Sequence, residues 1–420
     1  MTTLQLLSSN NNDTLSNEIQ KSNESYESNG NHSTRERMIP TSDAEITIGH
    51  DLELRKALIP LIVDMIPGWN DISHESHIQI ERISGALTNC VFFITKLQPP
   101  NKVENEKPPK IVTRIYGIGV DQFIDRQKEL RFLQMLSSVN IGPQLLGIFK
   151  NGRFEQYLES TTLTNAELRT QSCRIAQQMF QLHYIVRLFP PPRETIPEVW
   201  ANIDKWYPLV LNTIFSNAYR FTEEQKGDLK EFDFELLKFE IEHLKVMLSK
   251  LNSPIVFAHN DTQYGNILRL LDGTDQLVVV DFEYSGYNYR GFDIGNHWCE
   301  WMFDYHSSDP HKVNLDWYPT EEEQIKFLQA YILAEKQLSS SEERLIYSPS
   351  LSSSNDNHYL QKLRLEANAF ALSSHVMWGL WGLIQSGQSN INFDYLGYGM
   401  ARLKAFRDLS SEIYDKINLL

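Results

Sequence analysis

Two short segments carry the residue types that phosphoryl chemistry requires. The first is HNDTQYGN, from His259 to Asn266, and the second begins VVDFEY and contains Asp281. Asp261 is a candidate general base, because a hydroxyl group that attacks a phosphate must lose its proton. Asn266 and Asp281 offer an amide oxygen and a carboxylate, which are ligands suited to Mg²⁺. Asp261 alone would be read as a capping residue, but the full set predicts phosphoryl transfer from ATP.

Protein kinases place the same groups as H-R-D-x-x-x-x-N followed by D-F-G. This chain keeps the spacing of the first motif and the D-F of the second. It departs at Asn260, where protein kinases have arginine, and at Glu283, where they have glycine. Glu283 is a further candidate ligand for the metal or its water, or a contact for a cationic substrate. The aromatic and acidic residues that follow, from Tyr284 to Tyr305, suit a small cation better than a peptide.

In three stretches the chain resembles the choline/ethanolamine kinase family, a branch of the kinase-like phosphotransferases. The stretches are HNDTQYGNIL (259–268), VVDFEYSGYNYRGFDIGNHWCEWMFDY (279–305) and SSHVMWGLWGLIQS (373–386). A fainter resemblance runs from the region of Ile80 to the C-terminus. The resemblance implies a two-lobed protein-kinase-like α+β fold, with a small lobe that is mainly antiparallel sheet and a large lobe that is mainly helical. It also implies ATP and Mg²⁺, with choline or ethanolamine as the phosphoryl acceptor.

The family places its nucleotide loop in the turn that precedes Asn89. Backbone N–H groups of this turn, and the side chains of Ser84, Thr88 and Asn89, are expected to cover the phosphates. One glycine, Gly85, and a few hydroxyl groups describe any hairpin loop, so the assignment depends on the resemblance. Family members often have two adjacent glycines here, and Ala86 fills one of those places.

Arg114 ends an apolar segment that is expected to be a strand. Protein kinases place a lysine here to hold the α- and β-phosphates, and the resemblance implies that Arg114 does so in this chain, with Glu129 as its partner. The alternative is an ordinary solvated arginine. Glu155 and Gln156 match the family's link between the lobes, where the adenine edge is expected to be read.

The resemblance further implies a pocket for a quaternary ammonium group. Such a group has no N–H to donate, so aromatic faces and nearby carboxylates bind it. Trp378 and Trp381 are three residues apart on one expected helix, and taken alone they would be read as core residues. The expected substrate contacts are Asp261, Gln263, Tyr284, Glu300, Tyr305, Trp378, Trp381, Phe393, Tyr395 and Tyr398.

Choline is the expected substrate, because the chain keeps Tyr305 in a segment from which the ethanolamine branch usually departs. Ethanolamine kinase or dual activity is the alternative. More distant alternatives are an aminoglycoside-type phosphotransferase, which the aromatic set disfavours, and a catalytically dead kinase-fold binding protein, which the intact Asp261, Asn266, Asp281 and Arg114 disfavour. A choline kinase would supply phosphocholine for phosphatidylcholine biosynthesis, and homodimers are common in the family.

The amino-acid composition excludes some classes of binding partner and indicates the cellular compartment. The 420 residues are 41% hydrophobic and carry a net charge of −15, which argues against nucleic acid and against docking on anionic lipid. Three scattered cysteines without a C-x-x-C motif argue against a disulfide framework and fit a reducing compartment. The N-terminus lacks a secretory pattern, and the longest apolar stretch, Ala371–Ile384, is too short for a bilayer. A cytoplasmic protein without stable membrane insertion is expected.

Three regions are expected along the chain. Residues 1–48 form a disordered, polar tail, residues 49–158 form the N-terminal ATP-binding lobe, and residues 159–420 form the C-terminal catalytic and substrate-binding lobe, with a Ser-rich insertion at 338–357. The small lobe is expected to be a sheet with one helix. Its elements are strands at 78–83, 91–97 and 110–116, a helix at 125–137 and a hairpin at 148–158. Helical spacing of apolar residues predicts helices at 176–183, 237–248 and 365–376.

Overall fold

The computed structural model describes residues 39–83, 89–97, 108–117, 124–216, 220–338, 356–389 and 391–419. The chain forms two compact units. The sheet unit comprises the residues up to Val120 together with Leu133–Tyr157, and the helical unit comprises Asp121–Phe132 together with Leu158–Leu420. The division after Tyr157 lies one residue from the predicted boundary. Residues 121–132 were expected in the N-terminal lobe but group with the helical unit, so helix α4 (Arg126–Ser138) contributes to both units.

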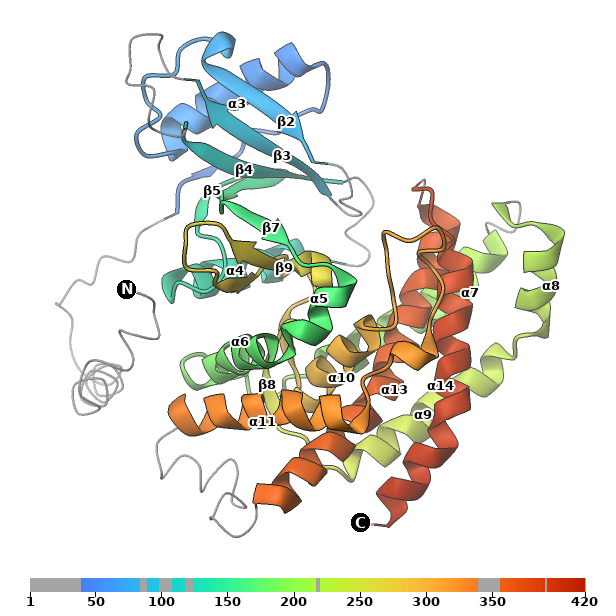
Figure 1. The fold of residues 1–420 in the computed structure, drawn as a ribbon. Helices are drawn as coiled ribbons and strands as arrows, with labels where there is room; N and C mark the ends of the chain where they lie inside the picture. The colour runs from blue at the N-terminus through green and yellow to red at the C-terminus, as the bar shows by residue number, and fades with distance from the viewer. Residues whose placement is uncertain are drawn as a thin grey trace. The chain divides into compact units, whose positions relative to one another are not determined.

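The sheet unit is built on a six-stranded, mainly antiparallel sheet with the strand order β1-β5-β6-β4-β3-β2 (Figure 1). Its strands are β1 (Thr41–Ser42), β2 (Ile78–Arg82), β3 (Asn89–Lys96), β4 (Lys110–Tyr116), β5 (Leu145–Phe149) and β6 (Gly152–Gln156). The predicted strands and the predicted hairpin are confirmed by antiparallel pairing of β2 with β3, of β3 with β4 and of β5 with β6. Arg114 lies on β4, a central strand of this sheet.

Helix α3 (Asp51–Met65) belongs to the sheet unit and was not predicted. Its apolar residues recur at helical spacing and are buried in one cluster with Ile94 and Phe154 of the sheet. The residues that α3 contributes to this cluster are Leu54, Leu58, Leu61, Ile62 and Met65. The expected sheet with a single helix was therefore incomplete. Pro60 lies inside α3, and proline is the residue that most weakens a helical signal in a sequence.

The segment before α3 corrects the predicted tail at 1–48. Strand β1 pairs in parallel with β5, and Ile46 is only 4% exposed. The Ile46 amide donates to Asn151 Oδ1 at 2.8 Å, and Asn151 Nδ2 donates to the Ile46 carbonyl at 2.7 Å. Burial of this isoleucine offsets the entropy lost when the segment is ordered. Residues 1–38, and residues 339–355 of the predicted insertion, lie outside the described residues.

The helical unit contains two small sheets and a set of helices. Strands β7 (Ser160–Thr162), β9 (Ile267–Leu270) and β10 (Leu277–Val279) form one antiparallel sheet, and β8 (Ile255–Ala258) pairs with β11 (Gly286–Tyr289) in the other. The helices are α5 (Asn165–Thr170), α6 (Ser172–Tyr184), α7 (Glu198–Ser216), α8 (Glu223–Glu231), α9 (Phe234–Ser249), α10 (Arg290–Glu300), α11 (Glu321–Leu338), α13 (Asp356–Gln388) and α14 (Tyr395–Asn418). The three helices predicted from apolar spacing are confirmed as parts of α6, α9 and α13.

Close packing of α13 and α14 brings distant aromatic residues together. A Cβ atom at Gly382 of α13 would lie 3.0 Å from the Cα of Gly399 on α14, so the two helices approach through glycines. Trp378 and Trp381 precede this contact on α13, and Tyr395 and Tyr398 precede it on α14. Helix α10 packs against α13 as well (Figure 1). The α10–α13–α14 packing is therefore the frame for the predicted substrate pocket.

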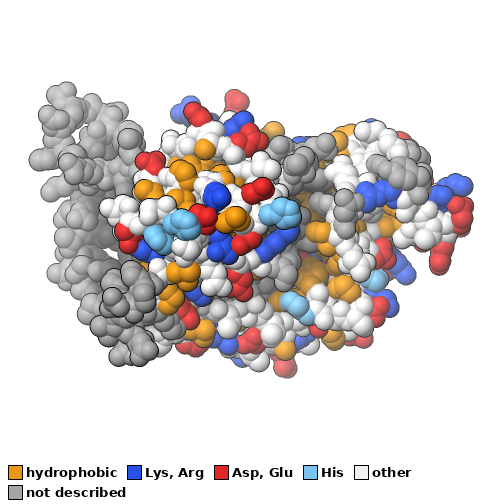
Figure 2. Space-filling view, turned by 90° about the horizontal axis from the view of Figure 1, so that it is seen from above, with side chains coloured by type: hydrophobic (Ala, Val, Ile, Leu, Met, Phe, Trp, Pro, Cys, Tyr) orange, Lys and Arg blue, Asp and Glu red, His pale blue; other side chains and the backbone are white. Residues whose placement is uncertain are grey.

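Charged side chains of both signs are mixed on the described surface. Figure 2 shows acidic and basic groups interspersed on the face that it presents. Ion pairs of the sheet unit include Lys96 with Asp71 at 2.5 Å and Lys56 with Glu75 at 3.9 Å. Exposed pairs of this kind contribute only about 0–1 kcal/mol each to stability. Within the described ranges, none of the helices combines the length and apolarity that crossing a bilayer requires.

Candidate active site

The backbone of the predicted catalytic segment is fixed by a buried aspartate on α10. Asp293 accepts hydrogen bonds from the backbone amides of His259 at 2.9 Å and Asn260 at 2.7 Å, and from His183 Nε2 at 3.0 Å. Burial by itself would raise the pKa of the Asp293 carboxyl, but the hydrogen bond and charge of His183, followed by the contributions of His259, lower it. A charged carboxylate therefore orients the loop. Sequence analysis missed Asp293, although it lies within the longest family-like stretch.

Two further residues of α10 continue this support. Asn296 Nδ2 donates to the Asn260 carbonyl at 3.0 Å. His297 Nδ1 lies 2.8 Å from the Thr262 carbonyl, and His297 Nε2 accepts from the Trp301 indole at 3.2 Å. Burial lowers the pKa of His297 to about 4, so the ring is neutral at pH 7 and its Nδ1 carries the donated proton. Helix α10 thus holds backbone groups of His259, Asn260 and Thr262 in the predicted catalytic loop.

Asn260, which replaces the arginine of protein kinases, links this loop to the next predicted segment. Its φ is +68°, a left-handed conformation that asparagine tolerates better than most side chains. Asn260 Nδ2 donates to the Tyr284 carbonyl at 2.8 Å, and its Oδ1 accepts from Asn288 Nδ2 at 2.8 Å. Where protein kinases have a charged arginine, this chain thus has a buried amide that links the 259–266 segment to the segment that begins at Val279.

Asp261 and Asn266 are brought together as the sequence predicts. Asn266 Nδ2 donates to Asp261 Oδ2 at 2.8 Å and to the Asp261 carbonyl at 2.9 Å. The amide nitrogen of Asn266 is used in these bonds, so Oδ1 is the atom suited to a metal ion. Burial, followed by the charges of Glu300, Asp281 and Glu283, raises the pKa of Asp261 well above its ordinary value. Four carboxylates therefore converge on this part of the helical unit.

Asp281 and Glu283 follow strand β10, which is half-buried at Val278 and Val279. Asp281 has a φ of +67°, and the preceding Val280 carbonyl lies 3.0 Å from His259 Nε2. Arg126 of α4 lies 3.8 Å from Glu283 and 2.8 Å from Glu129. Glu129, expected to pair with Arg114, thus contacts a different arginine, one that sequence analysis did not single out. The Arg114–Glu129 pair would join the two units and stays a prediction.

The donor set fits a magnesium nucleotide better than a metal held by protein alone. Among the described residues, no three His, Cys, Asp or Glu side chains gather as a complete metal site. Mg²⁺ is ordinarily held by one or two carboxylates together with the phosphates of a substrate. Asn266, Asp281 and Glu283 supply only hard oxygen ligands, and the charges of Asp281 and Glu283 are among those that raise the pKa of Asp261. The residues therefore fit the ion that the sequence predicts.

The predicted substrate aromatics form one cluster. Ring centres lie 5.0 Å apart for Tyr284 and Trp378, 5.6 Å for Trp378 and Trp381, and 5.6 Å for Trp381 and Tyr395. Phe393 lies 4.8 Å from Tyr395 and 5.9 Å from Tyr398. Trp381 Nε1 donates to Tyr284 OH at 2.9 Å. The cluster thus connects α13 and α14 to Tyr284, which directly follows Glu283.

Glu300 and Tyr305 join this cluster through an arginine that sequence analysis missed. Tyr305 OH donates to Glu300 Oε2 at 2.7 Å, and Arg402 of α14 donates to Glu300 Oε1. Tyr305 stacks on Phe303 with ring centres 5.7 Å apart. The side-chain oxygen of Gln263 accepts a hydrogen bond from the Gly265 amide at 2.6 Å, so this side chain caps the turn that follows it. Its contact with the substrate stays a prediction.

The predicted ATP-binding residues belong mainly to the sheet unit. Ser84, Gly85 and Thr88 lie outside the described residues, and Asn89 is described only as backbone of β3, opposite Tyr116. Glu155 lies 3.3 Å from Arg114 Nε and 2.6 Å from Arg153 Nε. Burial would raise the pKa of Glu155, but the two arginines lower it to about 2. Its side chain is therefore engaged with arginine. Gln156 is exposed and accepts from the Gln144 amide at 3.3 Å.

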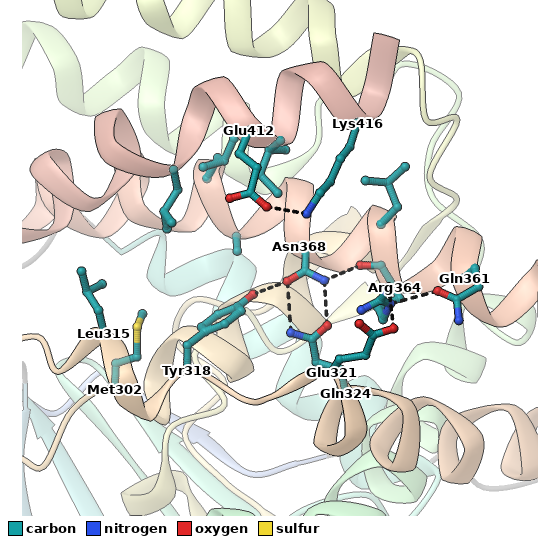
Figure 3. A pocket seen from close by; sticks show the side chains of 15 residues that line it. Met302, Leu315, Tyr318, Glu321, Gln324, Gln361, Arg364, Asn368, Glu412 and Lys416 are labelled. Carbon is teal, nitrogen blue, oxygen red and sulfur yellow. Dashed lines mark hydrogen bonds and ion pairs between the residues drawn. The ribbon is translucent and has the colours of Figure 1, made fainter. Parts of the chain in front are cut away.

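A separate cavity of about 510 Å³ lies among α11, α13 and α14 (Figure 3). None of the predicted site residues lines it. Its polar groups pair with one another: Asn368 bonds Tyr318 and Gln324, each at 2.9 Å, and Arg364 pairs with Glu321 at 2.9 Å. Because these groups are already satisfied, the cavity offers no polar anchor for the predicted substrates.

Comparison with known proteins agrees with the geometry. A family model described as choline/ethanolamine kinase matches residues 80–407. The chain is 33% identical over 343 residues to probable choline kinase 2 of Arabidopsis thaliana (80% of this chain, 87% of that protein). It is 33% identical over 352 residues to choline/ethanolamine kinase of Homo sapiens (80% and 81%).

Among solved structures, choline kinase from Cryptosporidium parvum matches with a TM-score of 0.67 and 26% identity, covering 86% of this chain and 96% of that one. The predicted kinase-like α+β fold, with one mainly antiparallel and one mainly helical unit, is confirmed. The family model, the two relatives and the matching fold together show that this chain belongs to the choline/ethanolamine kinase family.

Proposed function

We propose that this chain catalyses the ATP-dependent phosphorylation of choline to phosphocholine. Tyr284 carries the proposal, because it joins the catalytic loop to the aromatic cluster. Its carbonyl accepts from Asn260 of the loop at 2.8 Å, and its hydroxyl accepts from Trp381 at 2.9 Å. Burial, then the charges of Glu283 and Asp261, raise the pKa of Tyr284. A cation-binding cluster beside a candidate base suits an amino alcohol.

In the proposed reaction the hydroxyl oxygen of choline forms a bond to the γ-phosphorus of ATP. The bond from that phosphorus to the bridging oxygen breaks, ADP leaves, and the hydroxyl proton passes to the Asp261 carboxylate. The hydrogen bond from Asn266 orients Asp261. The raised pKa of Asp261 makes it a stronger base than an ordinary aspartate, provided that it is ionised at the working pH.

Asn266, Asp281 and Glu283 are the proposed Mg²⁺ ligands. When bound, the ion neutralises negative charge on the phosphates of ATP. Glu283 also lies 3.8 Å from Arg126, which limits its freedom to move toward a substrate cation. We therefore favour a metal or water ligand over a direct substrate contact for Glu283.

On the nucleotide side we propose that Arg114 binds phosphate, together with Ser84, Gly85, Thr88 and Asn89. The buried Glu155 lies 3.3 Å from Arg114 Nε and holds the guanidinium group in place. A guanidinium group suits phosphate oxygens because it can bind them through paired N–H donors. Glu155 and Gln156 remain the proposed neighbours of adenine.

Ethanolamine is the second candidate acceptor. The human relative described above is named choline/ethanolamine kinase, so one member of the family bears both names. A primary ammonium group can donate N–H bonds to carboxylates as well as contact aromatic rings. Choline is favoured here because the groups around the cluster are mainly rings, and its carboxylate Glu300 is already paired.

Purified protein tests the proposal directly. ADP release should be measured with ATP and Mg²⁺ in the presence of choline, ethanolamine, an aminoglycoside or no acceptor, and ³¹P NMR should identify the product. We expect choline-dependent ADP release with phosphocholine as the product, and no such release from the Asp261→Asn variant. Release that depends only on the aminoglycoside, or on no acceptor, would contradict the proposal.

A further inference from the structure

A buried ion pair lies among the predicted substrate residues. Arg402 Nη2 donates to Glu300 Oε1, and Arg402 Nε donates to Tyr398 OH at 3.1 Å. The guanidinium carbon lies 4.4 Å from the centre of the Phe303 ring and 5.2 Å from that of Tyr398. Tyr305 OH holds the second oxygen of Glu300 at 2.7 Å. One arginine therefore connects Glu300 with Tyr398 of the cluster and with the neighbouring ring of Phe303.

Both members of the pair are withdrawn from solvent. Glu300 is 3% exposed and Arg402 is fully buried. Burying a charged carboxylate without a cationic partner would be energetically costly, and the positive charge of Arg402 offsets this cost. Each Glu300 oxygen already accepts one hydrogen bond. The cluster therefore presents a neutral, hydrogen-bonded pair to an incoming cation.

This pairing affects primary and quaternary ammonium groups differently. A primary ammonium group has three N–H donors and gains charge-assisted hydrogen bonds from a free carboxylate. A quaternary group has no donor and gains only attraction from charge and from aromatic faces. A carboxylate that is neutralised and already hydrogen-bonded therefore weakens the binding of a primary amine more than the binding of a quaternary one, because only the primary amine loses hydrogen bonds.

We propose that Arg402 is a positioning residue that sets the amine preference of the site, by engaging Glu300 so that a quaternary ammonium substrate is favoured over a primary one. The inference rests on the proposed function, and it assigns Arg402 to selectivity, with no contact to the substrate required. It also revises the role of Glu300, which acts as the partner of Arg402 and Tyr305 more than as an acceptor for substrate N–H groups.

The test is the ratio of kcat/KM for choline to kcat/KM for ethanolamine. In Arg402→Met, the side chain keeps an apolar stem but Glu300 loses its cationic partner. We expect the ratio to move toward ethanolamine by about tenfold, as expected for one charge-assisted hydrogen bond gained by the primary amine. A role in folding alone would lower kcat for both amines together and leave the ratio unchanged.

A second variant keeps the arginine in place. Tyr305→Phe retains the ring that stacks on Phe303 but frees one oxygen of Glu300, so the ratio should move in the same direction by about threefold. The matched control is Tyr359→Phe: Tyr359 lies on α13, beside Arg290 at the opposite end of α10 from Glu300. Tyr359 OH accepts from Arg290 at 2.9 Å in a comparable buried pair, where Arg290 bonds Glu366 at 2.7 Å. The control should leave the ratio unchanged.

A shift in Tyr305→Phe and Arg402→Met, but not in Tyr359→Phe, supports the inference. If Arg402→Met does not fold, the comparison of Tyr305→Phe with Tyr359→Phe decides alone. An unmoved ratio in Tyr305→Phe, or an equal shift in the control, overturns the inference while the proposed function stands. If the unaltered protein phosphorylates neither amine, the proposed function fails and the inference fails with it.

Discussion

The two ends of helix α10 hold different parts of the site by different means. Near its start, Asp293 accepts hydrogen bonds from the backbone amides of His259 and Asn260. Further along the helix, Asn296 and His297 bond the carbonyls of Asn260 and Thr262. At its last residue, Glu300 contacts only side chains, Arg402 and Tyr305. The first end fixes main-chain geometry next to the base, whereas the second fixes the charge and orientation of groups in the aromatic cluster.

On the proposed function, the backbone of the catalytic loop and the amine-binding side chains are held within eleven residues of one helix. Backbone held by α10 carries Asp261, the proposed base for every acceptor. Side chains held at its end contact the aromatic cluster that we propose binds the ammonium group. Changes at the first end should therefore affect all acceptors alike, and changes at the second should affect one amine more than the other.

Asp261→Asn should give the largest effect. Replacing the proposed base removes proton acceptance while preserving the shape of the loop, and loss of a general base typically costs about 10²–10⁴-fold in rate. We expect kcat to fall by that amount with both amines, with ATP binding nearly intact. Steady-state kinetics and nucleotide titration check this, and near-normal kcat would remove Asp261 from the mechanism.

Asp293→Asn should impair both amines through the position of the loop. The substitution preserves volume but removes a charged acceptor from three hydrogen bonds. Hydrogen bonds to charged groups contribute about 1.5–3 kcal/mol, so we expect a loss of roughly 3 kcal/mol in the free energy of unfolding. Urea denaturation and kcat with each amine provide the measurements. A variant with a changed amine preference but a normal kcat would contradict the expectation that changes near the start of α10 affect both amines alike.

Trp381→Leu should act mainly on choline. The substitution keeps an apolar side chain but removes the ring quadrupole and the hydrogen bond to Tyr284. A loss of about 1–2 kcal/mol, roughly five- to thirty-fold in kcat/KM for choline, is expected from a desolvated cation–π contact. Ethanolamine should suffer less and the KM for ATP should change little. If both amines and ATP are weakened alike, Trp381 is a packing residue.

Two N-terminal truncations probe a region away from α10. Removal of residues 1–38 should leave activity and stability unchanged, because the sequence there lacks the apolar content to join a core. Removal of residues 1–50 also deletes the buried Ile46 and strand β1, and should lower the free energy of unfolding by about 1.5–3 kcal/mol. Thermal melts compare the two proteins. Equal stability would show that the segment from Thr41 to Ile46 contributes nothing.

Glu300→Gln should shift the pH dependence in a direction that the structure fixes. Asp261 must be ionised to act as a base, so kcat/KM falls as pH drops through its pKa. Glu300 is, after burial, the main cause that raises this pKa, and its loss also leaves the positive charge of Arg402 uncompensated. Both changes favour the ionised form and lower the pKa of Asp261. The acid limb of the pH profile should therefore move to lower pH, and a move to higher pH would contradict the assignment.

The parts of the site that the sequence predicts are those built from neighbours in the chain. Asp261 and Asn266 lie in one loop, and the hydrogen bond between them follows from their spacing. Trp378 and Trp381 follow from resemblance and helical spacing. Strands β2 to β6 are predicted because apolar runs rich in β-formers and the Asn151-Gly152 turn are local signals as well.

The missed features depend on partners that are remote in the chain. Arg402 meets Glu300 across 102 positions, and Asp293 meets His183 across 110. A buried arginine or aspartate has no local signature, because only the packing of α10 against other elements decides that it is buried and paired. Helix α3 was missed for a local reason, since Pro60 interrupts its pattern.

The central claim is that the aromatic end of the site selects a quaternary amine for a phosphoryl transfer that Asp261 carries out. An internal competition tests it most directly: purified protein, ATP and Mg²⁺ act on equal concentrations of choline and ethanolamine, and the initial product ratio gives the ratio of the two kcat/KM values. We predict phosphocholine in clear excess. An equal or greater yield of phosphoethanolamine would contradict the account.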